Sequence, residues 1–241
     1  RYVATQAVEM PNLGTSAEAA SVAYWRVHEK YLAKANEHRG VTLIGLTSHG
    51  PAVIQTKTPL KSLDDLNGQK IRVPGGVGSL VGKALGVTAV KLPAPKVYEA
   101  LSSGVADGIF MPIETQKSFR LKEVVPHVTI MPGGLYYGSF AFILNSDFLA
   151  GLSEADQKAV MSVSGEKLAK LAGQQWDAAD AAGLAAAKEA GTTITTASHD
   201  IHHQYLAIMA PVEAEWIERA NKAGIDGKAA LEELRAIARG Y

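Results

Sequence analysis

The chain has 241 residues, and its 24 lysines and arginines balance its 24 aspartates and glutamates. A net charge of zero gives no electrostatic reason to expect a nucleic-acid partner or an anionic membrane surface. The absence of cysteine excludes disulfides, thiolate metal sites and cysteine nucleophiles, while a hydrophobic fraction of 47% is enough for a real core. No apolar run approaches the roughly 20 residues of a membrane-spanning helix.

The first part of the chain reads as a helix followed by two strands. Thr15 or Ser16 suits the N-cap of a helix over residues 16–36, where apolar side chains recur at helical spacing. The β-branched run 41–46 predicts a strand, and residues 53–56 predict a second one. This order of elements indicates an α/β protein.

Residues 62–74, with the sequence SLDDLNGQKIRVP, carry the clearest functional signal. Ser62 suits an N-cap, and the apolar residues that alternate around Arg72 predict a buried strand that ends at Pro74. Arg72 is therefore expected at the carboxyl end of a strand, where its planar guanidinium can hold a carboxylate with two parallel hydrogen bonds. Taken alone, such an arginine is more often a solvated member of a surface ion pair.

The loop from Gly75 to Gly82 has the glycine content of a phosphate-binding loop. A nucleotide-binding P-loop requires a glycine at position 77 and a hydroxyl at position 84, where this chain has Val77 and Ala84. The sequence instead favours a turn that opens a helix near Ser79, whose amide end can still face an anion.

The middle of the chain alternates short strands and helices. The expected strands are 69–73, 87–90, 106–111 and 127–130, and the expected helices are 95–103 and 114–124. An aromatic-rich segment, 136–144, follows a Pro-Gly-Gly turn, and its length and irregular alternation predict a hinge strand that passes through two lobes.

A long helical pattern begins at Ser153, with Asp156 at the capping-box position, and continues to Ala190 without proline. This length predicts either a kink near Gly165 or Gly173 or a helix that spans both lobes. The remaining elements are predicted to be strand 192–196, helix 199–223 kinked at Pro211, and a last helix after Asp226.

Histidines cluster at the start of the predicted helix 199–223. His199, His202 and His203 lie near Asp200, with a spacing that allows two side chains to share a metal ion. No further ligand accompanies them, so exposed histidines at a helix start are the simpler interpretation and no metal is predicted. No nucleophile elbow and no Ser–His–acid grouping is present, so we predict no catalytic residue and no cofactor.

Four segments carry a family resemblance: PLKSLDDLNGQKIRVP at 59–74, VYEALSSGVADG at 97–108, SFAFILNSDFLAGL at 139–152 and LSEADQKAV at 152–160. Their order and spacing resemble those of the DctP-like extracytoplasmic solute-binding proteins of TRAP transporters. The resemblance runs from about Glu9 to the end of the chain. It implies a two-lobed, periplasmic-binding-protein-like α/β fold with hinge strands and a long lobe-spanning helix.

The resemblance also implies a function. A protein of this family is a periplasmic binding protein rather than an enzyme, and Arg72 takes the position of its carboxylate-binding arginine. The partners are then a small organic acid, held between the lobes, and the permease subunits of the membrane transporter. We expect a monomer with no nucleic-acid partner.

The lobes are expected to be discontinuous, because the chain crosses between them more than once. We predict lobe I from residues 1–55 and 137–175, and lobe II from residues 56–136 and 176–241. Family members begin with a βαβαβ unit and a signal peptide that are not visible in this sequence. Lobe I is therefore expected to be incomplete, without its first βαβαβ unit.

The sequence departs from the family before Pro59, where many members carry another arginine. This chain has Ala52 and Thr58 where cations often stand, although His49 and Lys57 lie nearby. Loss of a second cationic contact favours a monocarboxylate ligand over a dicarboxylate or a sialic-acid-like ligand.

Four side chains are candidates for the walls of the cleft. Many relatives place Glu and Asn after the Asp-Gly pair, where this chain has Phe110 and Met111, and the hinge segment adds Tyr136 and Tyr137. Because side chains alternate along a strand, Met111 and Tyr137 are chosen first and Phe110 and Tyr136 after them. Such walls suit an acid with an apolar or aromatic body, whereas the alternative is that all four residues belong to the core.

Two other functions remain open at this point. A periplasmic enzyme, a hydrolase or a phosphate-handling protein, could use the loop from Gly75 to Gly82 as an anion site. A binding protein that feeds a sensor rather than a permease would carry the same sequence signals.

Overall fold

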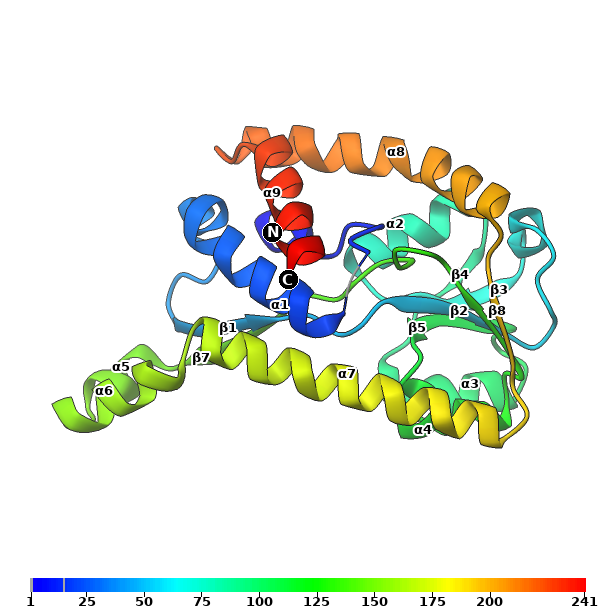
Figure 1. The fold of residues 1–241 in the computed structure, drawn as a ribbon, viewed down its shortest axis with the longest axis horizontal. Helices are drawn as coiled ribbons and strands as arrows, with labels where there is room; N and C mark the ends of the chain where they lie inside the picture. Colours follow the sequence, from blue (N-terminus) through cyan, green and yellow to red (C-terminus); the bar gives the residue numbers. More distant parts are fainter. Residues whose placement is uncertain (1, 15) are drawn as a thin grey trace.

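The computed structural model describes residues 2–14 and 16–241 and shows an α/β protein with two sheets (Figure 1). The larger sheet has six strands in the order β4-β3-β5-β2-β6-β8, and β1 pairs with β7 in a sheet of two strands. The strands are β1 (Thr42–Thr47), β2 (Ala52–Thr56), β3 (Lys70–Arg72), β4 (Thr88–Val90), β5 (Gly108–Pro112), β6 (His127–Ile130), β7 (Phe140–Leu144) and β8 (Thr193–Thr196). The helices are α1 (Ala17–Val27), α2 (Gly76–Ala84), α3 (Val97–Ser102), α4 (Thr115–Ser118), α5 (Ser146–Ala150), α6 (Glu154–Val163), α7 (Glu166–Glu189), α8 (His199–Lys222) and α9 (Gly227–Gly240).

Strand β2 lies inside the larger sheet and is buried along its whole length. It runs antiparallel to β5 and β6, whereas β3 runs parallel to both β4 and β5. The buried amide of Gln55 donates to the carbonyl of Met111 (3.1 Å) and to the hydroxyl of Thr115 (2.9 Å), so a polar side chain inside the sheet is satisfied. The strand predicted around Arg72 is confirmed as β3, and the arginine is its last residue.

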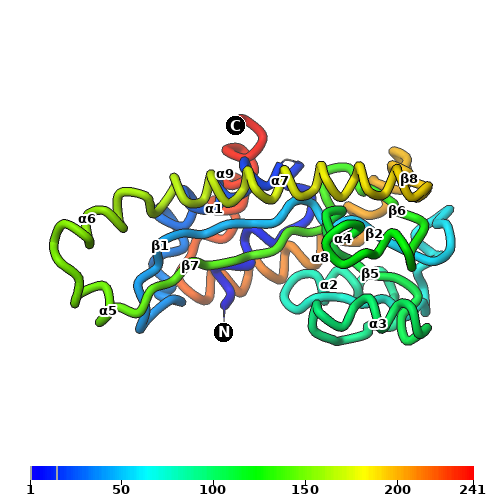
Figure 2. The backbone as a smooth tube through the Cα atoms, turned by 90° about the horizontal axis from the view of Figure 1, so that it is seen from below, coloured from blue at the N-terminus to red at the C-terminus, as the bar shows by residue number. Residues whose placement is uncertain are grey.

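The chain passes between the two sheets at residues 48–51 and again at residues 131–139. Figure 2 shows β1 and β7 running side by side toward the larger sheet. The two crossings are tied to each other, because the Ala52 amide donates to the Tyr136 carbonyl at 3.0 Å. The two connections between the sheets are therefore paired with each other, although neither segment is itself a strand.

A helix and a strand are shorter in the structure than the sequence predicts. The helix expected over 114–124 is interrupted, because Arg120 adopts a left-handed conformation with a φ of 57°. The strand expected over 136–144 begins only at Phe140, because its ladder with β1 ends at the pair of Phe140 with Thr47. The residues before Phe140 lack a partner strand there and run as an irregular connection.

The first predicted helix begins as expected. The Ser16 hydroxyl accepts the Ala19 amide at 3.1 Å, which makes Ser16 its N-cap, while Thr15 lies outside the described residues. The helix is α-helical to Val27, and it then continues as a π-helix and a short 3-10 turn instead of one regular helix over 16–36.

The helical pattern that begins at Ser153 forms two helices instead of one. The break falls at Gly165, whose φ of 69° separates α6 from α7. Helix α7 then lies along α1 and the small sheet at one end and along α4 at the other (Figures 1 and 2). The long spanning helix is thus α7 alone.

Two aspartates on α7 fix it to the starts of two other helices. Asp177 accepts the amides of Ala17 (2.7 Å) and Glu18 (3.0 Å), in the first turn of α1. Asp180, one turn further along, accepts the Glu114 amide (3.0 Å) at the start of α4. The two carboxylates satisfy amides that a helix start leaves without an intrahelical partner.

Asp180 is expected to make folding stability depend on pH. Burial raises the pKa of its carboxyl from 3.8 to about 7, outweighing the Glu114 amide bond, which lowers it. A carboxyl whose pKa is raised on folding contributes its full stabilisation only at pH values where it is protonated in both the folded and the unfolded protein. The contribution of Asp180 to the free energy of unfolding should therefore be lost as pH rises from about 4 to about 7.

The Asp180→Asn variant keeps an acceptor for the Glu114 amide but carries no charge. We expect it to be more stable than the parent at pH 8 by about 1–2 kcal/mol, and no more stable at pH 4. Urea unfolding at both pH values measures this difference. A variant less stable than the parent at pH 8 would show that the ionised carboxylate is favourable in the fold.

Helices α8 and α9 complete the core. The largest fully buried side chains include Trp216 on α8, Tyr24 on α1 and Tyr205, also on α8. Helix α9 packs on α1 (Figure 1). The division into lobe I and lobe II at the residues given above stays a prediction.

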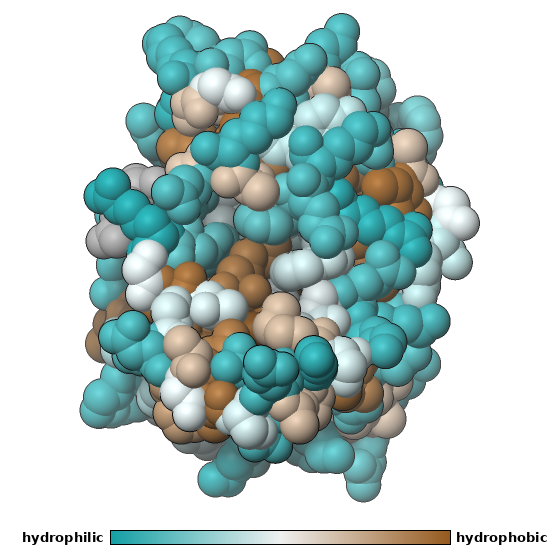
Figure 3. Space-filling model, turned by 90° about the vertical axis from the view of Figure 1, so that its left-hand side faces the viewer, coloured by the Kyte–Doolittle hydropathy of each residue, from teal (hydrophilic) through white to brown (hydrophobic). Residues whose placement is uncertain are grey.

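The small sheet and the helices after it expose large apolar side chains. Figure 3 shows apolar residues in a hollow at the end of the molecule that carries α5 and α6. The exposed large side chains of this region are Phe140, Phe142, Ile143, Phe148, Met161, Val163 and Leu171. Among the described residues, no helix combines the length and the apolar character needed to cross a membrane.

Candidate solute-binding site

Arg72 is a buried cation with no acidic partner. Its side chain ends β3 and is 7% exposed, and its Nε donates to the Leu92 carbonyl at 3.3 Å. Arg72 takes part in no ion pair with an acid among residues 2–14 and 16–241. Burial lowers the pKa of the guanidinium, the direction that follows when water is removed from a charge without a neighbouring acid. An anion is the group that would complete this site.

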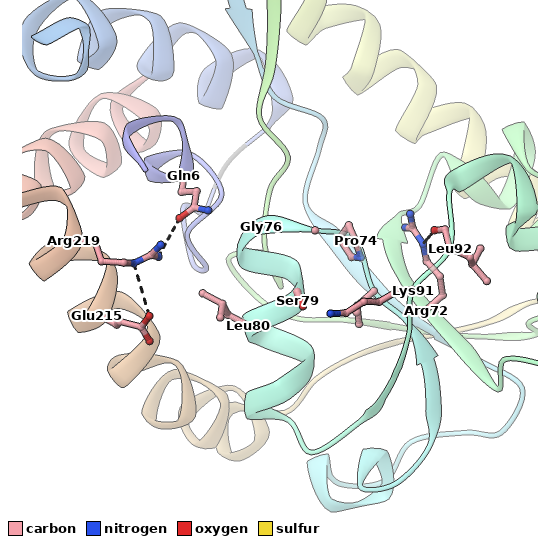
Figure 4. Close-up of a pocket in the computed structure, with 12 residues that line it drawn as sticks. Gln6, Arg72, Pro74, Gly76, Ser79, Leu80, Lys91, Leu92, Glu215 and Arg219 are labelled. Carbon is pink, nitrogen blue, oxygen red and sulfur yellow. Dashed lines mark hydrogen bonds and ion pairs between the residues drawn. The ribbon is translucent and has the colours of Figure 1, made fainter. Parts of the chain in front are cut away.

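A cavity of about 580 Å³ opens at Arg72 (Figure 4). One side is formed by β3, the residues after β4 and the first turn of α2, and the other side by the segment before α1 and by α8. Its lining residues are Gln6, Arg72, Val73, Pro74, Gly75, Gly76, Ser79, Leu80, Lys91, Leu92, Glu215 and Arg219.

The two buried or half-buried arginines of this cavity differ in their partners. Arg219 donates to the Gln6 side chain at 3.0 Å and lies 3.8 Å from the Glu215 carboxylate, so its charge already has an acidic neighbour. Arg72 has only the Leu92 carbonyl, although Lys91 lies beside it on the same side of the cavity (Figure 4). Of these two arginines, Arg72 is therefore the one with no acid beside it among the described residues.

Residues at the start of α2 line the same cavity as Arg72. Gly76 adopts a φ of 61°, and a Cβ there would collide with the carboxylate of Glu9. That carboxylate accepts the Val77 amide at 2.9 Å. Burial raises the pKa of Glu9 from 4.5 to about 7, against the Val77 hydrogen bond, which lowers it. A glycine at position 76 is thus required both by the turn and by the close approach of Glu9.

A family model described as "Bacterial extracellular solute-binding protein, family 7" (DctP) matches residues 3–219 of the chain. The chain belongs to this family. It is a family of extracellular solute-binding proteins rather than of enzymes, and the resemblance seen in the sequence is confirmed.

Solved solute-binding proteins share the fold of the chain. A TRAP periplasmic solute-binding protein of Bordetella bronchiseptica, solved with bound (R)- and (S)-mandelate, has a TM-score of 0.95 and 40% identity and is matched over 100% of this chain and 76% of its own. A marine metagenome TRAP solute-binding protein described as specific for aromatic acid ligands, in complex with metahydroxyphenylacetate, has a TM-score of 0.91 and 34% identity, over 100% of this chain and 76% of its own.

A curated relative matches at the level of sequence. The "outer membrane transporter protein TsaT" of Comamonas testosteroni is 30% identical over 235 residues, which cover 97% of this chain and 69% of the relative. The chain thus spans about three quarters of the solved solute-binding proteins and somewhat less of this relative. The two-lobed α/β fold predicted from the sequence is confirmed by the solved structures.

Of the five residues predicted to contact ligand, Arg72 is the one that lines the cavity. Phe110 and Tyr137 are fully buried in the core, and Tyr136 is 3% exposed, with its hydroxyl donating to the Phe110 carbonyl at 2.8 Å. Met111 is partly exposed and packs against a second apolar cluster. In this structure these four side chains do not line the cavity, and their contact with ligand stays a prediction.

Several lining residues were not found from the sequence. Gln6, Glu215 and Arg219 reach the cavity from segments far from Arg72 in the chain, so no local pattern brings them together. Leu92 could have been found, because it follows β4, which runs parallel to β3 and ends beside it.

The geometry does not support the phosphate-loop alternative. Lys83 stands in the last turn of α2 and is exposed, so it lies at the opposite end of the helix from the amides of Gly76 and Val77. A P-loop lysine must instead reach the phosphates cradled by the loop.

The predicted absence of a metal site remains an expectation from the sequence. Across residues 2–14 and 16–241 no group of three or more His, Cys, Asp or Glu side chains is placed to share an ion. The ring of His199 stacks on that of His203 at 6.4 Å, and the His199 side chain is 90% exposed.

Proposed function

We propose that the chain captures a small aromatic monocarboxylate in the cleft at Arg72 and delivers it to the permease subunits of a TRAP transporter. The observation that carries the proposal is the buried guanidinium of Arg72, which has a carbonyl partner but no acid. A buried charge is costly unless it is paired, so a site that keeps one without an internal partner is suited to an anionic ligand.

The solved relatives support the aromatic part of this proposal. The relatives with bound mandelate and metahydroxyphenylacetate each hold an acid with an aromatic ring. In this chain Leu80 and Leu92 line the same cavity as Arg72, so apolar surface lies within reach of its charge. Phe110, Met111, Tyr136 and Tyr137 do not line the cavity in this structure, and we propose that Met111 and Tyr137 in particular contact the ring when the lobes close.

The proposal also includes a location, an oligomeric state and a motion. The protein acts in the periplasm as a monomer, and it closes by a hinge motion about the two paired connections between the sheets. Closure brings the lobe that carries Arg72 against the other lobe and encloses the ligand. The proposed lobes are residues 1–55 with 137–175, and 56–136 with 176–241.

A panel of acids read by calorimetry tests the ligand class. We expect benzoate, mandelate and 3-hydroxybenzoate to bind at least about a hundredfold more tightly than a uronate, because each sugar hydroxyl buried without a partner costs about 1–3 kcal/mol. Benzyl alcohol is the matched control, since it keeps the ring and lacks the carboxylate. Tight binding of a uronate or a sialic acid, with no response to the aromatic acids, would overturn the proposal.

A further inference from the structure

Glu9 places a carboxyl group against the first turn of α2, whose residues Gly75 and Gly76 line the cavity at Arg72. Its Oε2 accepts the Val77 amide at 2.9 Å, and the absence of a side chain at Gly76 lets it approach. The same turn, through Gly75 and Gly76, lines the cavity at Arg72. One short stretch of backbone therefore has an internal acid on one side and the ligand cavity on the other.

The contact joins parts of the chain that are distant in sequence. Glu9 belongs to the segment before α1, and Val77 lies in the first turn of α2, 68 residues later. The backbone of Glu9 is also linked to the hinge connection, because its carbonyl accepts the Tyr137 amide at 3.4 Å. Glu9 thus connects the segment 131–139 between the sheets to the first turn of α2, which lines the cavity.

The charged and titratable groups around Glu9 can be named element by element. Tyr24 on α1 and Tyr136 on the hinge connection interact electrostatically with Glu9, and burial raises the pKa of both phenols. Beyond Tyr136 lies Arg72, which interacts with the same phenol. On its other side Glu9 lines a second cavity of about 430 Å³, whose other ionisable lining residues are Tyr2, Glu37, His38 and Arg39.

Few of these groups change charge between pH 6 and pH 8.5. The phenols of Tyr24 and Tyr136 stay neutral because their pKa values are raised, and burial lowers the pKa of His38. Arginines stay charged throughout. Glu9 is the group at the first turn of α2 whose pKa, about 7, lies within this interval.

We propose that Glu9 is a positioning residue of the ligand site, which holds the first turn of α2 in place and whose ionisation weakens binding of the ligand's carboxylate. The inference rests on the proposed function. Protonated Glu9 still accepts the Val77 amide through its carbonyl oxygen, so the turn stays held while Glu9 adds no negative charge near Arg72 and Lys91. Ionised Glu9 places a negative charge at those amides and competes with the incoming anion.

The sign of the pH effect follows from this competition. Benzoate and mandelate are fully ionised above pH 6, so only the protein changes charge. Their affinity should fall as pH rises through the pKa of Glu9, and binding near pH 7 should take up part of a proton. The affinity is expected to fall about tenfold between pH 6 and pH 8.5. A loss of this size corresponds to the partly screened repulsion between the Glu9 carboxylate and the carboxylate of the ligand.

The test compares the whole chain with its Glu9→Gln and Asp180→Asn variants, by calorimetry with benzoate and mandelate at several pH values from 6 to 8.5. Gln keeps an acceptor for the Val77 amide without the charge, so Glu9→Gln should bind with less than about a twofold change across the interval. Asp180 is the matched control, because burial raises the pKa of its carboxyl to the same value on α7, where it does not line the cavity, and its variant should keep the parent's pH dependence. A Glu9→Gln variant with the parent's pH dependence would overturn the inference and leave the proposed function standing.

A second measurement needs no ligand. The ¹⁵N shift of the Val77 amide should titrate near pH 7 in the parent and in Asp180→Asn, and should stay flat in Glu9→Gln. If the parent bound no aromatic acid at any pH, the proposed function would fail, and the ligand-site role of Glu9 would fail with it. If the Val77 amide instead titrated near 4.5, the ordinary carboxyl pKa, the inference would fail whatever the ligand.

Discussion

Replacing Arg72 by alanine is expected to weaken the binding of benzoate and mandelate at least about a hundredfold, because truncation of one partner of a buried charge pair costs about 2–5 kcal/mol. The affinity of Arg72→Lys should fall between those of the parent and of Arg72→Ala. An ammonium group keeps the charge but loses the planar guanidinium and one of its two parallel hydrogen bonds to the carboxylate. Calorimetry on the three proteins measures the series.

The same substitution should not destabilise the protein, which separates a binding role from a structural one. Arg72 is buried with no acidic partner among the described residues, so its removal relieves a desolvation cost and breaks one hydrogen bond, to the Leu92 carbonyl. The thermal midpoint of Arg72→Ala without ligand should equal or exceed that of the parent.

Arg219→Ala is the control within the cavity. Arg219 lines the same space but is already paired with Gln6 and Glu215, so its loss should change acid affinity by less than about tenfold. An Arg72→Ala protein that binds aromatic acids as the parent does would remove the observation on which the proposed function rests.

Local patterns were enough to predict the strand that ends at Arg72. A capping Ser62, apolar residues in alternation and a terminating Pro74 depend only on neighbours in sequence, and the structure confirms the strand and the Ser62–Asp65 capping box. The family resemblance added the two-lobed fold, because the order of several motifs carries information that no single element has.

Elements were predicted too long where a distant partner sets their end. The ladder of β7 stops at Phe140 because β1 supplies no residue beyond Thr47, and nothing in the sequence of the hinge segment itself marks that limit. The role of Glu9 was hidden for the same reason. Its burial, which raises its pKa, and its hydrogen bond from the Val77 amide, 68 residues away, both depend on the folded structure and leave no local pattern in the sequence.

Substituting alanine for Gly183 on α7 is expected to destabilise the fold by about 2–4 kcal/mol. Helix propensity alone predicts that the substitution stabilises the fold, because alanine is about 1 kcal/mol more favourable than glycine inside a helix. Packing should decide, since a Cβ at Gly183 would collide with the backbone of Ile113 and Glu114, where α7 meets the start of α4. Backbone atoms cannot move aside as a flexible side chain can.

Gly151→Ala is the matched control for this substitution. Gly151 follows α5 with a φ of −78°, and the nearest atoms to an added Cβ are backbone oxygens at 3.4 and 3.5 Å, an ordinary contact distance. Its stability should therefore stay within about 0.5 kcal/mol of the parent in urea unfolding. Gly183→Ala should unfold at a lower urea concentration with an unchanged dependence on denaturant. A Gly183→Ala protein as stable as the parent, or more stable, would show that α7 and α4 are not held in close backbone contact, and that Asp180 alone joins them.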